Sequence, residues 1–113
     1  MHIDFDRIEE NLIHNPRGGQ GTFGMRQYAT RDNRVFRGRL LPGSCFGQHT
    51  HDTNSETMFF LSGTGKMVTP EGEERVYPGA VQHCPKGGIH YLVNDGEEDL
   101  VFYGVIPEHG MPG

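Results

Sequence analysis

The sequence predicts an all-β protein, built as an antiparallel β-sandwich or jelly roll. Three observations support this. The 113-residue chain is long enough for one hydrophobic core and too short for two. Its 17 glycines and 7 prolines suit many turns and short strands rather than long helices. From residue 22 onward, apolar runs of strand length are separated by turn residues, with no helical segment between them.

The first 21 residues differ from the rest of the chain. Residues 1–14 have the only helix-like composition, in which Ile8, Leu12 and Ile13 can form a short apolar stripe. An N-terminal arm laid against a partner subunit is an equal alternative. Residues 15–21, which contain four of the glycines and prolines, have the composition of a mobile loop.

We therefore predict an N-terminal arm and loop over residues 1–21, a β-barrel domain over 22–107 and a flexible tail over 108–113. Clear turn signals, such as Pro42-Gly43, Ser62-Gly63 and Pro78-Gly79, separate the strands of the middle region. The main predicted strands cover residues 24–29, 34–41, 56–61, 66–69 and 100–106.

Composition and charge narrow the classes of partner. The formal net charge is −5, from 10 basic and 15 acidic side chains, and no basic stripe is present, so nucleic-acid binding is disfavoured. No apolar run approaches the roughly 20 residues of a membrane span. The N-terminus lacks the basic and apolar regions of a signal peptide. With only 2 cysteines, the expectation is a reduced, cytoplasmic chain.

Two segments carry histidines, a glutamate and glycines at fixed spacing. In the first segment, Gly43 is followed after five residues by His49 and His51, then by Glu56 and finally by Gly63. Residues i and i+2 of a strand point to the same face, so the two histidines are expected to point together.

The second segment contains Gly79, Pro85, Gly87, His90 and Asn94. The two segments resemble the two signature motifs of the cupin family, and all ten fixed positions match. At about 5% usage per residue type, chance agreement at ten positions is on the order of 10⁻¹³. The resemblance implies a small antiparallel jelly-roll β-barrel, the double-stranded β-helix of cupins.

The resemblance also implies that His49, His51, Glu56 and His90 bind one divalent transition metal per chain. Imidazole and carboxylate ligands suit iron, manganese, nickel, zinc, copper or cobalt, whereas calcium prefers oxygen ligands. Four protein ligands on one side of an octahedral ion leave two positions open for a substrate or for dioxygen. The glycines of both motifs are expected at tight turns that need positive φ.

The wall of the pocket is predicted from strand parity. Met58 and Phe60 share the parity of Glu56 and are expected to line the pocket, and Phe102 is a further candidate. Such an apolar wall with few polar groups is typical of a small-molecule site.

The candidate catalytic residues are His83, Arg39 and Tyr28. His83 is either a general base or extra ligand in the pocket, or a histidine of the surface or of a dimer interface. Two strands carry arginines, Arg26 on the first and Arg37 and Arg39 on the second. An inward arginine would bind a substrate carboxylate; the alternative is a solvated outer face.

Two classes of function remain open at this point. The first, which the family resemblance favours, is a metal-dependent enzyme acting on a small anionic or polyhydroxylated metabolite: a dioxygenase, decarboxylase, lyase or isomerase. The second is a non-catalytic protein that binds or senses a metal-held ligand. Similar small cupins commonly pair, so a homodimer is also expected.

Overall fold

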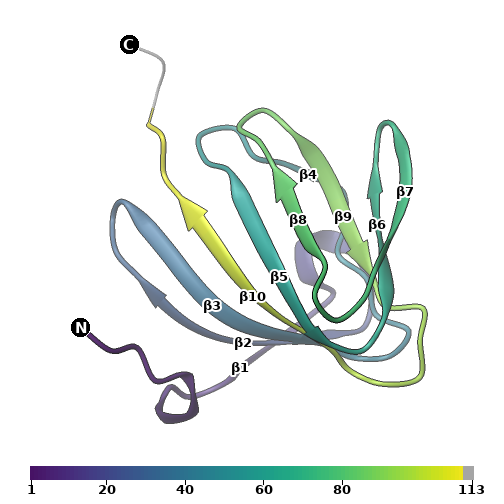
Figure 1. Cartoon of the computed structure of the whole chain (residues 1–113), viewed down its shortest axis with the longest axis horizontal. Coiled ribbons are helices and arrows are strands. Elements are labelled where there is room, and N and C mark those ends of the chain that lie inside the picture. The colour runs from purple at the N-terminus through teal and green to yellow at the C-terminus, as the bar shows by residue number, and fades with distance from the viewer. Residues whose placement is uncertain (111–113) are drawn as a thin grey trace.

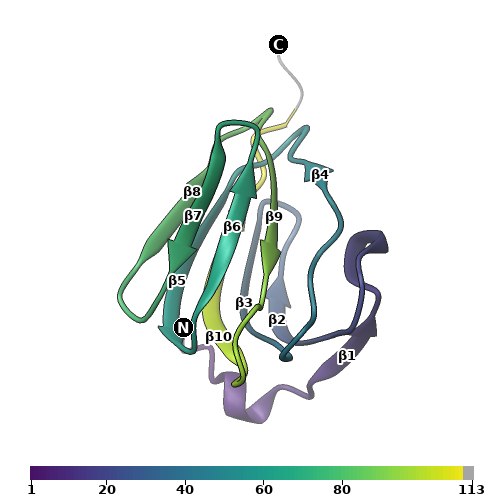
Figure 2. The ribbon, with the colours of Figure 1, turned by 90° about the vertical axis from the view of Figure 1, so that its right-hand side faces the viewer.

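In the computed structural model, which describes residues 1–110, two antiparallel sheets face each other and enclose one core (Figures 1 and 2). The larger sheet contains, in spatial order, β1 (Asn11–His14), β2 (Thr22–Ala29), β3 (Asn33–Leu40), β10 (Leu100–Pro107), β5 (Glu56–Ser62) and β8 (Val81–Cys84). The smaller sheet contains β4 (His49–Thr50), β9 (Ile89–Val93), β6 (Gly65–Thr69) and β7 (Gly72–Val76). The all-β jelly-roll prediction is therefore confirmed.

Helical structure in residues 1–110 is limited to two short 3-10 turns, η1 (Phe5–Arg7) and η2 (Pro16–Gly18). Neither turn comes near the length needed to cross a lipid bilayer, and no other helix occurs in this part of the chain.

The core lies between the sheets and is built by alternation along the strands. In β10, Leu100 and Phe102 are fully buried, whereas the neighbouring Tyr103 is 38% exposed on the outer face. The Phe102 ring stacks on Phe23 at a centroid distance of 5.9 Å. These aromatic contacts fix the spacing of the central strands.

Gly104 explains how β10 and β3 approach each other so closely in the core. A Cβ atom on Gly104 would overlap the ring of Phe36, its cross-strand partner. The Phe36 ring also meets Phe102 edge-on at a centroid distance of 6.0 Å. The glycine therefore makes room for an aromatic ring rather than for a turn.

The N-terminal residues do not form the helix that was one of two alternatives for this segment. Residues 11–14 form β1, which pairs with β2 in the register Asn11↔Met25 to His14↔Thr22. The physical reason is that only Ile13 packs against the core, whereas Leu12 is 54% exposed, an alternation of period two that suits an edge strand.

The turns follow the sequence expectation. Gly43, Gly63, Gly79 and Gly87 all adopt positive φ, between 77° and 94°. Asn94 closes the turn after β9 by accepting a hydrogen bond from the Gly96 backbone N–H at 2.9 Å.

The predicted flexible tail covers residues 108–113, of which residues 111–113 lie outside the described part of the chain. Within the described part, the Glu108 backbone N–H donates to the Asp32 carbonyl, and the His109 N–H donates to the Thr53 carbonyl, both at 2.8 Å. These two residues are therefore tied to the loops at the barrel rim.

The fold makes a prediction about two leucines of unequal burial. Leu40→Ala removes a fully buried side chain of β3 and should lower the free energy of unfolding by about 2–5 kcal/mol. Leu12→Ala, the matched control on the exposed face of β1, should change it by about 0.5 kcal/mol or less. Urea denaturation measures both values, and equal losses would contradict the assignment of the core.

Candidate metal centre

Four side chains converge at one end of the space between the sheets. His49 lies in β4 and is the cross-strand partner of His90 in β9. His51 follows β4 directly, and Glu56 is the first residue of β5 in the opposite sheet. The site therefore joins both sheets, and strand pairing fixes the positions of His49 and His90.

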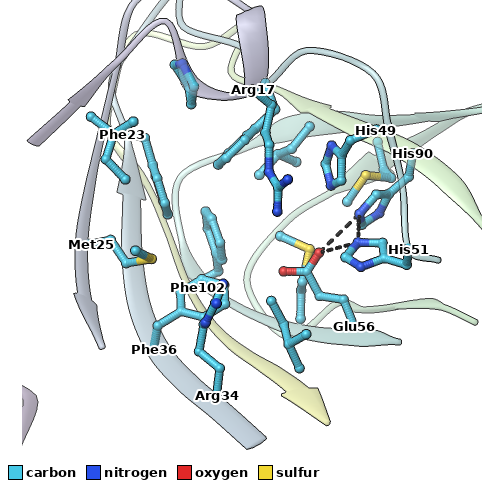
Figure 3. Close-up of a pocket in the computed structure, with 17 residues that line it drawn as sticks. Arg17, Phe23, Met25, Arg34, Phe36, His49, His51, Glu56, His90 and Phe102 are labelled. Atoms are coloured by element: carbon cyan, nitrogen blue, oxygen red, sulfur yellow. Dashed lines mark hydrogen bonds and ion pairs between the residues drawn. The ribbon is translucent and has the colours of Figure 1, made fainter. Parts of the chain in front are cut away.

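The donor atoms of these residues lie close together. The Glu56 Oε1 atom is 3.0 Å from Nε2 of His90 and 3.3 Å from Nε2 of His51 (Figure 3). The two Nε2 atoms are themselves 2.9 Å apart. With His49 included, one donor atom from each residue lies within 4.8 Å of the others. This spacing fits four ligands of a single ion.

The electrostatics of the cluster favour an ionised carboxylate. Burial alone would raise the pKa of Glu56, but the bonds with His51 and His90 outweigh burial and lower this pKa to about 2. The bond with Glu56 raises the pKa of His51 against the effect of its own burial. Burial lowers the pKa of His49 by more than the hydrogen bond with the Gly47 carbonyl raises it.

The far ring nitrogens of two histidines are held by fixed partners. The Nδ1 atom of His49 lies 3.0 Å from the Gly47 carbonyl oxygen, and Nδ1 of His51 lies 2.5 Å from Oδ1 of Asn54. Because both partners accept hydrogen bonds, Nδ1 carries a proton in each ring, and Nε2 is the atom that can bind a metal once its own proton is lost. Metal-ligating histidines are oriented in this way, so the donor set fits a divalent transition metal.

The cluster opens into a cavity of about 210 Å³ that is otherwise largely apolar (Figure 3). This volume lies below the roughly 300–1,000 Å³ of drug-sized sites, which implies a compact ligand. Its apolar walls come from both sheets and include Phe23, Phe36, Phe46, Phe102, Met58 and Leu92.

Of the three residues predicted to line the cavity, two do so and one lies behind the cavity wall. Met58 and Phe102 line the cavity. Phe60 is also buried, but it lies among the core residues and packs against Phe102 at a ring-centroid distance of 5.5 Å. It therefore supports the wall from behind.

The candidate catalytic residues point away from the cavity. Arg39 binds Glu10 through two hydrogen bonds, of 2.7 and 2.8 Å, and Asp99 at 3.2 Å. Tyr28 is 38% exposed and is not part of the cavity lining. His83 is exposed, and its Nδ1 atom lies 3.0 Å from the hydroxyl of its cross-strand partner Thr57.

The other arginines considered from the sequence also lie outside the cavity. Arg26 donates to the Ile8 carbonyl oxygen at 2.6 Å, and Arg37 pairs with Asp6 at 2.6 Å. These side chains occupy the outer face of the larger sheet, where they attach the N-terminal segment.

Two arginines that sequence analysis did not select line the cavity instead. Arg34 precedes Phe36 by two residues on β3 and therefore shares its inward parity, a signal that was present in the sequence. Arg17 lies in η2, a loop whose path no periodicity indicates. Its position depends on the folded chain.

The cysteines are structural. Cys84 is buried, and burial raises the pKa of its thiol, which keeps it protonated. The backbone of Cys45 forms isolated antiparallel β-bridges with the backbones of Gln20 and Val93. Neither belongs to the ligand cluster.

Comparisons with known proteins agree with the geometry. The chain is 30% identical to an oxalate-binding protein of Thermotoga maritima over 112 residues, which cover 94% of this chain and 93% of that protein. A solved structure of a predicted oxalate decarboxylase from the same organism aligns with a TM-score of 0.89 and 29% identity over 96% of this chain and 99% of that one.

More distant similarities extend to isomerases. A glucose-6-phosphate isomerase of Pyrococcus abyssi is 36% identical over 64 residues, which cover 52% of this chain and 34% of that protein. The model of the cupin domain matches residues 36–106, a segment that contains all four residues of the cluster. The chain belongs to the cupin family.

Proposed function

We propose that His49, His51, Glu56 and His90 hold one divalent transition metal and that the protein binds a small carboxylate of the oxalate class at this metal. The observation that carries the proposal is the buried cluster of three imidazoles and one ionised carboxylate at the end of a compact cavity. The oxalate-binding relative supports the choice of ligand class.

The charge of the site agrees with an anionic ligand. Three neutral imidazoles and one carboxylate leave a divalent ion with a net charge of about +1. When bound, such a metal supplies Lewis acidity and open coordination positions, and a compact dicarboxylate can chelate it through two oxygens. The apolar walls exclude water around this contact and strengthen it.

The cavity favours binding over acid–base catalysis. Apart from the four cluster residues, the only titratable side chains among the described lining residues are Arg17 and Arg34. A guanidinium stays protonated at any physiological pH and does not exchange protons with a substrate. Decarboxylation or isomerisation needs a proton donor or base, and among residues 1–110 none lines this cavity apart from the cluster itself. Metal-dependent ligand binding is therefore our proposal, ahead of an enzymatic role.

The ligand set can be tested by metal content. The double substitution His49→Ala, His51→Ala should reduce bound manganese or zinc from one ion per chain to near zero, because two of four ligands are lost. His83→Ala, the control on the outer face of β8, should retain one ion per chain. Elemental analysis after dialysis gives the ratio, and full occupancy in the double variant would place the metal elsewhere.

The ligand class can be tested by thermal stability. Oxalate at 100 times its dissociation constant should stabilise the manganese-loaded protein by about 2.7 kcal/mol, whereas acetate, with one carboxylate, should have little effect. Without metal, oxalate should have no effect either. Incubation with oxalate should release no formate or carbon dioxide. Turnover would favour the enzymatic alternative, and absence of metal-dependent stabilisation would exclude the proposal.

We also propose that two copies of the chain associate through the outer face of strands β10, β5 and β8. Tyr103, Phe59 and Val81 are successive cross-strand neighbours there and are 38%, 42% and 54% exposed. Leu61, on the same strand face as Phe59, is 41% exposed. A contiguous apolar patch of this kind is typical of an interface between subunits.

Light scattering should therefore report about twice the 12.7 kDa chain mass at micromolar concentration. Phe59→Glu should produce monomers, because it places a charge at the centre of the patch. Tyr28→Glu, an aromatic control with 38% exposure on β2, should leave the mass unchanged. A monomeric mass for the unmodified protein would refute the interface.

A further inference from the structure

The arginines divide sharply according to whether they have a partner. Of the eight in the chain, six bind an acceptor within residues 1–110. Five form ion pairs with carboxylates, namely Arg7, Arg31, Arg37, Arg39 and Arg75. A sixth, Arg26, donates to a backbone carbonyl. Acidic side chains outnumber basic ones by 15 to 10, so unpaired arginines are unexpected.

The remaining two arginines are the two that line the metal cavity. Within the described chain, neither Arg17 nor Arg34 has a carboxylate within 4.0 Å or a side-chain hydrogen bond. Figure 3 shows both guanidinium groups directed into the cavity, Arg17 from the side of η2 and Arg34 from the opposite wall on β3. Both residues are also exposed to solvent, and each carries five N–H donors, some of which can reach a ligand in the cavity.

The backbone that positions the Arg17 side chain is in a strained conformation. Arg17 has φ 54° and ψ 30°, and Asn15 has φ 52° and ψ 56°, both in the left-handed region that disfavours side chains. Such strain persists only where surrounding structure imposes it, and it concentrates at functional sites. Here the imposed bond is that from the Gly47 N–H to the Pro16 carbonyl, at 3.0 Å.

Gly47 links this loop to the ligand cluster. A Cβ atom on Gly47 would collide with the Arg17 carbonyl oxygen, so the two backbones are in direct contact. The Gly47 carbonyl in turn receives the bond from His49. One residue therefore fixes both a cluster histidine and the loop that carries Arg17, which sets their relative position.

The lining between the two arginines is apolar. Figure 3 shows Phe36 and Phe102 beside Arg34, with the four cluster residues on the other side of the cavity next to Arg17. Oxalate has no hydrocarbon part and would leave this surface uncovered. A ligand with a short hydrocarbon body would cover this surface and gain affinity from each CH₂ group that it removes from water.

We infer that Arg17 and Arg34 form an anion clamp that selects a dicarboxylate longer than oxalate. Its metal-chelating head lies beside Arg17, its hydrocarbon body lies along the phenylalanines, and its distal carboxylate binds Arg34. Arg17 and Arg34 are thus specificity-determining residues. The inference rests on the proposed metal-dependent carboxylate binding and assigns the ligand class for the same site.

A matched pair of probes isolates the distal contact. 2-Oxoglutarate and 2-oxopentanoate share a chelating 2-oxo-carboxylate head and chain length, and only the former has a distal carboxylate. Calorimetry with the manganese-loaded protein should show 2-oxoglutarate binding about 10-fold or more tightly than 2-oxopentanoate, the gain of a charge-assisted hydrogen bond. Arg34→Gln should abolish this difference, because it removes the donor to the distal carboxylate.

Arg17→Gln should weaken all three probes, including oxalate, by about 10-fold or more, because it removes the contact to the head group. Arg31→Gln is the control, since this side chain is 95% exposed and remote from the cavity lining. Metal content and melting temperature without ligand should match the unmodified protein in all three variants, which separates loss of binding from loss of fold.

The outcomes separate this inference from the proposed function. If oxalate binds the metal-loaded protein but the two 2-oxo acids bind equally, or if Arg17→Gln leaves oxalate affinity intact, the clamp is wrong and metal-dependent binding stands. If the unmodified metal-loaded protein binds no carboxylate, the proposed function fails and the clamp fails with it.

Discussion

The ionised carboxylate of Glu56 is the group on which the site depends. It is 7% exposed, and an unpaired charge at such depth costs about 3–5 kcal/mol, so the structure must provide cationic or hydrogen-bonding partners. His51 and His90 supply them at 3.3 and 3.0 Å. Those histidines come from the opposite sheet, so Glu56 links both layers of the barrel. A divalent metal among these atoms would satisfy the same charge more fully.

The positions of the motif residues could be predicted from the sequence because the strands and turns that carry them are regular. Strand pairing places His49 opposite His90, and turn glycines with positive φ set where each strand starts, so fixed spacing in sequence translates into fixed positions in space. The inward position of Met58 followed from the same rule, whereas Phe60, predicted in the same way to line the pocket, is buried behind its wall. Features governed by local alternation were therefore predictable.

Features governed by long-range contacts were not predictable. The segment that forms β1 has helix-like composition, and only pairing with β2 makes it a strand. Arg17 enters the cavity because Gly47, thirty residues away, holds its loop. Alternation along β3 places Arg37 and Arg39 on one face of the sheet but does not say whether that face is the inner or the outer one. The outer face is the one they occupy, because their carboxylate partners Asp6 and Glu10 lie there.

The cavity also changes the balance between the two functional classes. Family resemblance favoured an enzyme, but the described lining contributes two permanently charged arginines and no free acid or base. The two arginines and the cluster can bind and orient an anion, which supports the binding role that we propose. A cluster that fits a metal, together with a small apolar chamber, is sufficient for that role.

The most direct test of this account is an anomalous-diffraction map from crystals grown with manganese. We predict one anomalous peak per chain, about 2.0–2.2 Å from Nε2 of each of the three histidines and from a Glu56 carboxylate oxygen. Coordination positions facing the cavity should be left for the ligand. A peak at any other group of residues, or no peak at saturating manganese, would contradict the central claim that this cluster is a metal site.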